Sequence, residues 1–438
     1  MRTTRFYIIL PLLVVSFIRG YAENQFPSVL RAGTCSEASM AEWLTDSIDA
    51  LIEDAIDQGA FPGAQILIAR NGVVVHDKSY GEITEGGPSV TPNTLYDLAS
   101  VSKAIGTLPA VMLAVDRGYI DIDKPLSHYY KPLQETDKKD LTVREFLFHE
   151  TGMPAALNMF AVMMDDGKPG GILRKDIVSE VKTQDNPVEM AENMFVGNAA
   201  MDTIMNRICH IGLRKDKSYN YSCLNFALLK AAVESATGVE MSHWCDSLLW
   251  KPLGLNNMCY RPKERFPLDS IAPTELDTLF RKQLVHGYVH DEMAAFSGGI
   301  QGNAGLFANT GDIARICRMW LNNGEYDGVR ILKPETVELF IKTVSPTCRR
   351  GLGFDKPDVK HPENSPTTEL ANASTFGHLG FTGTMFWVDP VNDLIVVFLT
   401  NRVNPTRNNA AFARLNVRPD IMRLALKSIS ESNQTGRE

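Results

Sequence analysis

An unbroken apolar run at residues 394–399 is the feature that most constrains what this chain can fold into. Its sequence, Leu-Ile-Val-Val-Phe-Leu, has no polar position, which is typical of a strand buried on both faces. The turn-rich residues 389–393 separate this run from a second predicted strand at 384–388. The sequence therefore predicts a strand pair inside a sheet that is covered on both sides.

A second strand pair is predicted near the other end of the chain. Asn71 and Gly72 separate residues 65–70 from residues 73–78, and both segments are rich in strand-forming residues. Asn-Gly is the dipeptide that best fits a tight turn between antiparallel strands. We therefore expect a hairpin here.

Helical patterns flank the two strand pairs. Residues 43–56 keep a helical period, which begins at a capping box of Ser39 and Glu42 and ends at Gly59. Residues 421–429 predict a closing helix. The expected fold class is α/β, of the α+β type, with an antiparallel sheet flanked by N- and C-terminal helices.

The middle of the chain has a different character. Residues 120–290 contain helical patches, such as 144–150 and 225–236, and few stretches alternate as strands do. We expect a largely helical second domain inserted between two parts of the sheet domain. The expected boundaries are 39–118 and 295–430 for the α/β part, 119–294 for the mostly helical part, 23–430 for the whole unit, and 431–438 for a disordered tail.

The N-terminus carries a targeting pattern. An apolar run at residues 6–18 follows two arginines and is too short to span a bilayer. Gly20 and Ala22 then form a small-x-small cleavage pattern, so we expect a secretory signal peptide over residues 1–22. The alternative is a retained anchor. Since no later segment could span a membrane, the mature protein is expected to be periplasmic or secreted.

The charge balance excludes one class of partner. The chain has 44 basic and 52 acidic residues, a formal net charge of −8. Cleavage of the signal peptide would remove Arg2, Arg5 and Arg19, leaving 41 basic against 52 acidic residues, or −11. This charge argues against nucleic acid or an anionic surface as a partner. The oligomeric state is left open.

The cysteine and histidine spacing predicts no metal or cofactor. Seven cysteines are scattered without a C-x-x-C pattern, and their odd number leaves at least one thiol free unless two chains pair. His286 and His290 could ligate a metal if they lay on a helix. Gly287 and the acidic pair after His290 make a loop equally plausible.

Ser100 begins the stretch with the clearest chemical signal. A mostly apolar helical run follows it and is closed by Gly118, so Ser100 would lie at a helix N-terminus. Lys103, one turn later, would lie on the same face and could take the hydroxyl proton if burial lowers its pKa. Free backbone N–H groups at the helix end could stabilise an oxyanion.

The pattern Ser-x-x-Lys occurs a second time, at Ser179 and Lys182. This copy lies in a charged run and looks like part of a solvated surface. We therefore expect it to be exposed and inert.

Two later motifs support Ser100. Tyr221 could act as acid or base beside a positive lysine, although this motif taken alone is better explained as a turn that enters a helix, with Tyr221 covering the core. His378 lies in a glycine-rich stretch before a strand, where it could supply a cationic or proton-responsive group. An exposed histidine in a turn is the alternative interpretation.

Together these motifs resemble a known family. Ser-Val-Ser-Lys at 100–103, Tyr-Ser-Cys at 221–223 and His-Leu-Gly at 378–380 resemble the serine β-lactamase and penicillin-binding protein superfamily. The similarity is closest to its class C-like branch, which includes esterases and D-amino-acid peptidases. Residues 141–152 and 302–307 look like the same branch.

The resemblance implies a role for each matching residue. Ser100 would be the acylated nucleophile, Lys103 its base or proton relay, and Tyr221 a partner in proton transfer and deacylation. Phe381 and Ser100 would offer backbone N–H groups to the oxyanion. His378 would stand where many relatives place a lysine beside the substrate carboxylate.

The pocket positions depart from the family pattern. Cys223, Leu379 and Gly380 would line the substrate pocket, but Cys223 replaces a favoured asparagine and Leu379 a frequent hydroxyl residue. Cysteine cannot hold a substrate amide as asparagine does. The resemblance therefore implies intact acylation chemistry with weak β-lactam hydrolysis.

Three functions remain in view at this stage. The leading hypothesis is an exported serine hydrolase that acts through an acyl-enzyme on an ester or a D-amino-acid-containing peptide. The alternatives are a true class C-like β-lactamase and a non-turnover protein that binds penicillin or cell-wall fragments. Each implies a small-molecule or peptide ligand and no cofactor.

Overall fold

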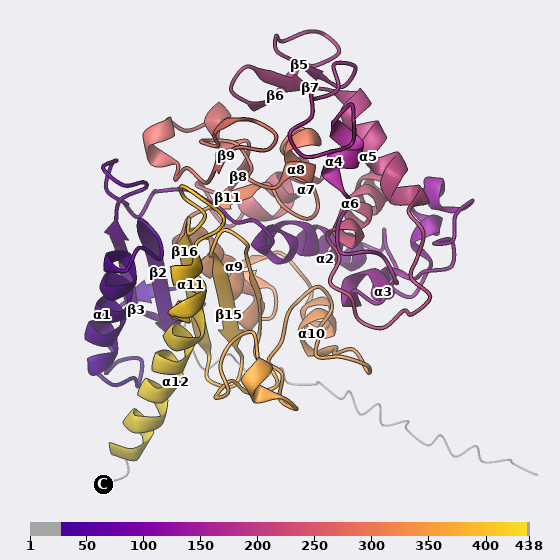
Figure 1. Ribbon diagram of the computed structural model, residues 1–438. Helices are drawn as coiled ribbons and strands as arrows, with labels where there is room; N and C mark the ends of the chain where they lie inside the picture. Colours follow the sequence, from indigo (N-terminus) through magenta and orange to yellow (C-terminus); the bar gives the residue numbers. More distant parts are fainter. Residues whose placement is uncertain (1–27, 436–438) are drawn as a thin grey trace, which may run out of the picture.

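A six-stranded sheet organises the computed structural model, which describes residues 28–435 (Figure 1). Its strand order is β1-β3-β2-β16-β15-β14, and only the contact between β1 and β3 is parallel. The strands are β1 (Arg31–Ala32), β2 (Gly63–Arg70), β3 (Val73–Gly81), β14 (Phe376–Leu379), β15 (Met385–Asp389) and β16 (Leu394–Thr400). The pairing of β2 with β16 joins the two ends of the chain, and the predicted fold class is confirmed.

The hairpin between β2 and β3 turns at the predicted dipeptide. Asn71 and Gly72 both have positive φ, 54° and 75°, which is the conformation of a type I′ turn. The second predicted pair is also present, as β15 and β16. Both short-range strand predictions are therefore confirmed.

Strand β16 is buried on both faces, as its unbroken apolar sequence predicts. Leu394, Val396 and Phe398 belong to one hydrophobic core, and the residues between them belong to a second core on the other face. Helices α1 (Trp43–Asp57) and α12 (Val417–Thr435) contact one another over the first core. Helix α9 (Thr310–Leu321) packs on the second.

The ends of the helical layer differ from the predictions. Ser39 has φ 54° and does not cap α1, and the Glu42 carboxylate instead accepts from the Ser36 N–H at 3.0 Å. The predicted capping box is therefore wrong, because Ser39 lies in a turn before the helix and the Glu42 side chain accepts from that turn. Helix α12 continues to Thr435, so residues 431–435 are helical, and the Trp43 indole donates to Glu431 at 2.8 Å. The predicted signal peptide lies outside the described residues.

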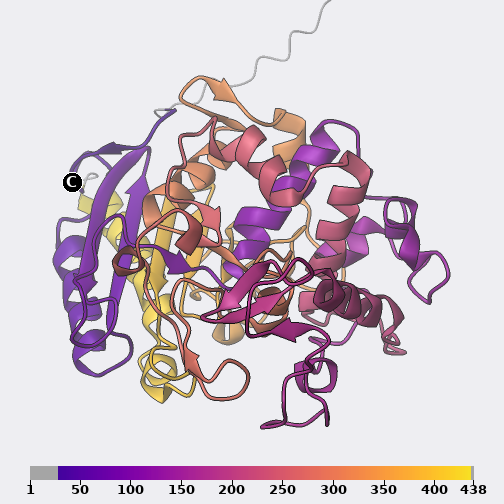
Figure 2. The ribbon, with the colours of Figure 1, turned by 90° about the horizontal axis from the view of Figure 1, so that it is seen from above.

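The rest of the chain packs beside the second core and contains most of the helices (Figures 1 and 2). The helices of this part are α2 (Leu108–Asp116), α3 (Val143–Phe148), α4 (Met159–Met163), α5 (Asn198–His210), α6 (Cys223–Thr237), α7 (Met241–Cys245), α8 (Glu292–Phe296) and α10 (Pro334–Lys342). Helix α11 (Ala410–Arg414) instead precedes α12 and packs on the first core. A π-helical segment, Lys103–Thr107, leads into α2. None of the described helices is long and apolar enough to cross a membrane.

Short strands interrupt this region more often than the sequence indicates. They are β4 (Tyr96–Asp97), β5 (Val178–Ser179), β6 (Val188–Ala191), β7 (Met194–Val196), β8 (Cys259–Tyr260), β9 (Leu276–Asp277), β10 (Gln283–Leu284), β11 (Leu306–Ala308), β12 (Glu325–Tyr326) and β13 (Val329–Arg330). The sheet β4-β11-β8 positions Ser100, because β4 ends three residues before it.

Candidate active site

Ser100 lies at the junction between β4 and the helical segment that leads into α2. The residue before it, Ala99, has φ 46°, a left-handed conformation that is strained for alanine. The buried Asp97 carboxylate holds this turn, because it accepts from the Ala99 N–H at 2.8 Å and from the His290 N–H at 2.6 Å. Ser100 therefore follows a sharp turn that two hydrogen bonds to the Asp97 carboxylate hold in place.

Lys103 contacts Ser100 as its one-turn spacing predicts. The buried amine donates to the Ser100 Oγ at 2.9 Å, to the Asn303 carbonyl oxygen at 3.0 Å and to the Cys223 Sγ at 3.5 Å. An ammonium group has three N–H donors, and each of them has an acceptor here. The site is therefore built around a protonated lysine.

The pKa of Lys103 moves in the direction opposite to the one expected from sequence. Burial lowers this pKa, but the Cys223 thiol and the Tyr221 hydroxyl raise it by more, so the net direction is upward. The expectation of a lysine with a lowered pKa is wrong, because it considered burial without the groups that surround the amine.

Tyr221 stands beside the lysine, at the entrance to α6. Ser222 caps this helix, since its Oγ accepts from the Leu224 N–H at 3.2 Å and donates to the Pro154 carbonyl at 2.7 Å. The Lys103 amine lies 5.1 Å from the centre of the Tyr221 ring. The structure therefore brings the first two motifs together.

His378 also lies at this site, but as a neutral group. It is buried in β14, and its ring centre lies 6.0 Å from that of Tyr221. Its Nδ1 lies 2.8 Å from the Leu379 carbonyl oxygen, so Nδ1 carries the proton. Burial, assisted by the positive charges of Arg350 and Lys103, lowers its pKa to about 3. The expectation of a cationic or proton-responsive histidine near neutral pH is therefore wrong.

A second buried histidine, His149, was missed by the sequence analysis. It follows α3 with φ 59°, and its ring centre lies 4.7 Å from that of Tyr221. Its Nδ1 accepts from the Ser222 N–H at 3.1 Å, so the proton is on Nε2. Burial and then Arg350 hold its pKa well below the ordinary value. The only sequence signal was its position inside the family-like stretch 141–152.

Arg350 is the other functional candidate that the sequence analysis missed. It is buried, and its Cζ lies 5.5 Å from the ring centre of Tyr221 and 5.9 Å from that of Tyr219. The Nη1 atom pairs with the Asp355 carboxylate at 3.0 Å. No motif marks this arginine, because it lies in an irregular loop far along the chain from Tyr221.

The loop that carries Phe381 is fastened to the strand before Ser100. Thr382 Oγ1 donates to the Asp97 carbonyl at 2.7 Å, and Thr384 Oγ1 donates to the Leu98 carbonyl at 2.9 Å. Only glycine fits at position 380, because a Cβ there would lie 2.6 Å from the Leu98 oxygen. Within the described residues, neither the Ser100 N–H nor the Phe381 N–H donates to a protein acceptor, as an oxyanion hole requires.

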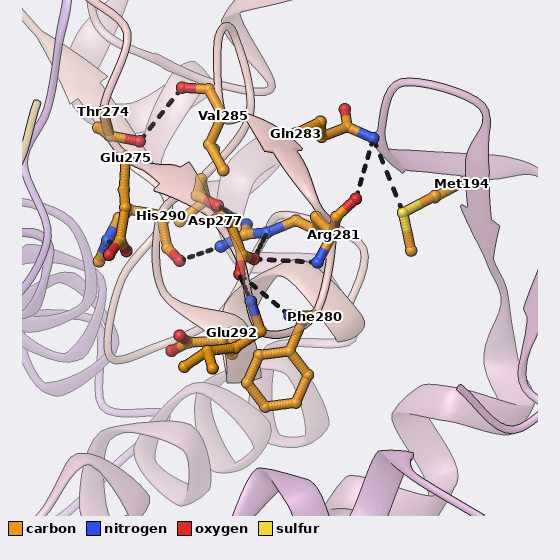
Figure 3. A network of polar contacts seen from close by, with 12 residues as sticks. Met194, Thr274, Glu275, Asp277, Phe280, Arg281, Gln283, Val285, His290 and Glu292 are labelled. Carbon is orange, nitrogen blue, oxygen red and sulfur yellow. Dashed lines mark hydrogen bonds and ion pairs between the residues drawn. The ribbon is translucent and has the colours of Figure 1, made fainter. Parts of the chain in front are cut away.

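The Phe381 side chain forms part of the rim of this loop. It is 48% exposed, stacks on His290 with ring centres 5.6 Å apart, and lies under the Arg402 guanidinium at 4.6 Å. The His290 Nε2 pairs with Glu275 at 2.9 Å, as Figure 3 shows. In the same network Arg281 donates to the His290 carbonyl at 2.8 Å. The buried His290, held by these contacts, thus packs against the ring of Phe381.

The alternative sites considered from sequence do not assemble. Ser179 Oγ donates to the Val181 carbonyl at 2.7 Å, and Lys182 is exposed.

The candidate metal ligands His286 and His290 lie in a loop with separate partners, since the His286 Nε2 contacts the Leu268 carbonyl at 2.8 Å. In the described part of the chain no group of three or more histidine, cysteine or acidic side chains could hold a metal. All seven cysteines are free.

A serine and a lysine one turn apart on a buried helical segment, next to an antiparallel sheet, are compatible with the site of a serine hydrolase. The comparisons with known proteins agree. The beta-lactamase family model matches residues 48–417, so the chain belongs to the beta-lactamase family, whose members are serine hydrolases.

Relatives cover most of the chain. A protein of Escherichia coli O157:H7 named "Putative D-alanyl-D-alanine carboxypeptidase" is 29% identical over 384 residues, 82% of each chain. A protein of the same name from Salmonella agona is 28% identical over 397 residues, covering 83% of this chain and 85% of its own.

Solved structures share the fold at lower identity. EstCE1, a hydrolase with promiscuous acyltransferase activity, has a TM-score of 0.64 at 18% identity, over 90% of this chain and all of its own. A penicillin-binding protein homologue from Caulobacter crescentus has a TM-score of 0.63 at 17% identity, over 90% and 99% of the two chains. A class C beta-lactamase from Rhodobacter sphaeroides has a TM-score of 0.58 at 16% identity, over 86% and 99%.

Proposed function

We propose that this protein is exported and hydrolyses an ester or a D-amino-acid-containing peptide through an acyl-enzyme at Ser100. The observation that carries the proposal is the Lys103 amine, which donates to the Ser100 Oγ at 2.9 Å beside Tyr221. The relatives named as D-alanyl-D-alanine carboxypeptidases support the peptide, and the fold shared with EstCE1 is compatible with an ester. The predicted signal peptide supports export.

In this proposal Tyr221 is the base that activates Ser100. Lys103 has no free lone pair, because its three N–H groups donate to Ser100, Asn303 and Cys223. Tyr221 takes the proton of Ser100 as the Oγ attacks the carbonyl carbon.

The remaining steps use the same groups. The N–H groups of Ser100 and Phe381 stabilise the oxyanion of the tetrahedral intermediate. The intermediate then collapses, and Tyr221 returns the proton to the departing alcohol or amine, which leaves an ester on Ser100. A water molecule loses its proton to Tyr221 and attacks the carbonyl carbon of this ester. The bond from that carbon to the Ser100 Oγ then breaks, Tyr221 returns the proton to Oγ, and the acid product leaves.

The pocket favours these substrates over β-lactams. The Cys223 thiol is turned toward the Lys103 amine at 3.5 Å, and Leu379 offers no hydroxyl. A β-lactam needs its side-chain amide and its carboxylate held as well as an oxyanion hole. A site without those polar partners discriminates against ligands that require them.

A panel of p-nitrophenyl esters, D-Ala-D-Ala peptides and nitrocefin tests the proposal. The protein should hydrolyse an ester or a D-peptide faster than nitrocefin, and S100A should lose roughly 10³-fold or more of that activity. S179A is the matched control, because it removes the other serine of the same pattern, and it should behave as the unmodified protein.

Each other result points to a different function. Activity that survives in S100A but not in S179A would contradict the site. Faster hydrolysis of nitrocefin than of esters would favour a β-lactamase. A stable acyl adduct on Ser100 without turnover, detected by mass spectrometry, would favour a binding protein.

A further inference from the structure

His290 is a buried residue that other groups hold at three points, although the proposed mechanism does not use it. Its Nε2 lies 2.9 Å from the Glu275 carboxylate. Its N–H donates to the Asp97 carboxylate at 2.6 Å, and its carbonyl oxygen accepts from Arg281 at 2.8 Å (Figure 3). The backbone and the ring of this histidine are therefore both fixed, which the alternative of a metal ligand does not explain.

The backbone N–H of His290 is connected to the turn that presents Ser100. The Asp97 carboxylate that accepts from His290 also accepts from the Ala99 N–H at 2.8 Å. Ala99 directly precedes Ser100, whose own N–H is the first donor of the candidate oxyanion hole. One carboxylate therefore joins His290 to the first half of the hole.

The ring of His290 contacts the second half of the hole. It stacks on the Phe381 ring with the centres 5.6 Å apart and the planes at 24°. The Arg402 guanidinium also lies over the Phe381 ring, at 4.6 Å, and its Nε donates to the Phe381 carbonyl at 2.8 Å. Phe381 is thus held by two side chains although it is 48% exposed.

The two side chains that contact Phe381 are linked to each other through Arg407. The Arg407 Nε donates to the Glu275 carboxylate at 2.7 Å, and the Arg407 carbonyl accepts from the Arg402 Nη1 at 3.2 Å. The contacts close a ring whose members are Phe381, His290, Glu275, Arg407 and Arg402. Paired charges in a protein interior often add little net stability, so the ring is better explained by the position that it fixes.

We infer that His290 is a positioning residue that sets the two N–H groups of the oxyanion hole relative to each other, one through the Asp97 carboxylate and the other through the Phe381 ring. The inference rests on the proposed function, in which those N–H groups stabilise an oxyanion. His290 does not touch the reacting atoms. It acts through Phe381, because the ring and the N–H belong to the same residue of the loop.

The first test measures how well the hole binds a tetrahedral oxyanion. Ethylboronic acid forms a tetrahedral adduct with a serine Oγ and carries no ring that Phe381 could contact. Its dissociation constant is measured by boron NMR titration of the unmodified protein and of each variant. H290A and F381A should each weaken binding roughly ten-fold or more, because a displaced donor stabilises an oxyanion poorly. H290F keeps a ring against Phe381 and should restore most of the affinity.

The kinetics of ester hydrolysis provide the second readout. H290A and F381A should each lower kcat roughly ten-fold or more, with a smaller change in KM. The double variant H290A/F381A should lose no more than the larger single loss, because both changes remove the same contact. F381A alters an exposed side chain, so it tests this contact even if H290A does not fold.

H76A is the matched control. His76 is also buried, stacks on an aromatic ring, that of Tyr80, and lies 3.7 Å from a carboxylate, that of Asp49. It lies on β3, however, away from the loop of Phe381. H76A should lower stability and leave both kcat and the boronate dissociation constant in place.

Three results would overturn the inference. H290A or F381A could leave the boronate dissociation constant unchanged, their losses in kcat could multiply in the double variant, or the unmodified protein could fail to bind the boronate. Failure of the proposed function looks different. A protein that hydrolyses none of the three substrate classes, but binds the boronate more weakly in H290A and F381A, would contradict the function and support the role of His290.

Discussion

Cys223 is the single residue that most separates this site from a β-lactamase. Its Sγ accepts from Lys103 at 3.5 Å, so the thiol completes the shell around the amine but offers a substrate no strong donor. An asparagine could accept from the lysine with its oxygen and still donate with its amide nitrogen.

C223N should therefore raise nitrocefin kcat/KM relative to ester kcat/KM. We expect about 1–2 kcal/mol, the value of one hydrogen bond, which is roughly ten-fold in the ratio. C348S is the matched control, since Cys348 is also partly exposed but contacts Glu150 instead of Lys103. An unchanged or lower ratio in C223N would contradict the role given to this position.

Helix α1 and strand β3 meet at a buried histidine. The His76 Nε2 lies 2.7 Å from the Tyr80 hydroxyl, which donates to Asp49 at 2.6 Å. Burial is the main cause that lowers the pKa of His76 from 6.5 to about 4. The folded protein therefore keeps this histidine neutral over a pH range in which the unfolded chain protonates it.

This difference makes stability depend on pH. Above pH 6.5 neither state binds the proton, and between pH 6.5 and about 4 only the unfolded state does, so the free energy of unfolding falls as the pH falls. H76Q, which cannot titrate, should lose less stability over that window in urea denaturation. Equal slopes for H76Q and the unmodified protein between pH 6.5 and 4 would show that His76 does not cause the loss.

The loop after β14 is the element whose placement matters most for the proposed chemistry. The Thr382 Oγ1, one residue after Phe381, ties this loop to the Asp97 carbonyl at 2.7 Å. T382V removes this bond while keeping the shape of the side chain. The expected result is a fall in ester kcat of about ten-fold with a smaller change in KM, because the bond acts on oxyanion geometry.

T336V is the control for this variant. Thr336 Oγ1 makes a bond of the same length, 2.7 Å, to Asp116 at the far end of α2. It should lower stability without lowering kcat. If both variants change kcat equally, the Thr382 bond has no special connection to the oxyanion hole.

For the whole molecule, the sheet was predictable from local patterns, but the site was predictable only in part. The Asn71-Gly72 turn and the buried strand β16 are each specified by a short stretch of sequence, so both could be predicted from local patterns. The contact between Ser100 and Lys103 follows from helix geometry in the same way. Arg350 and His149 could not be found like this, because tertiary packing alone brings them to Tyr221.

The protonation states of the site residues could not be predicted from the sequence either. A lysine pKa expected to fall is raised, and a histidine expected to be cationic is neutral. Each depends on the sum of burial and several charges from distant segments. The sequence names the groups but does not give their distances.

The two cores that meet at β16 provide the last prediction. Leu394 and Leu399 lie on this one strand, both fully buried, and they belong to opposite cores. A sheet covered on both sides requires both side chains, so L394A and L399A should each lower the free energy of unfolding by about 2–5 kcal/mol in urea denaturation. L276A, at a leucine that is 51% exposed, should change it by less than about 0.5 kcal/mol. A cost near zero for either β16 variant would mean that its core contributes little to the stability of the sheet that carries the candidate site.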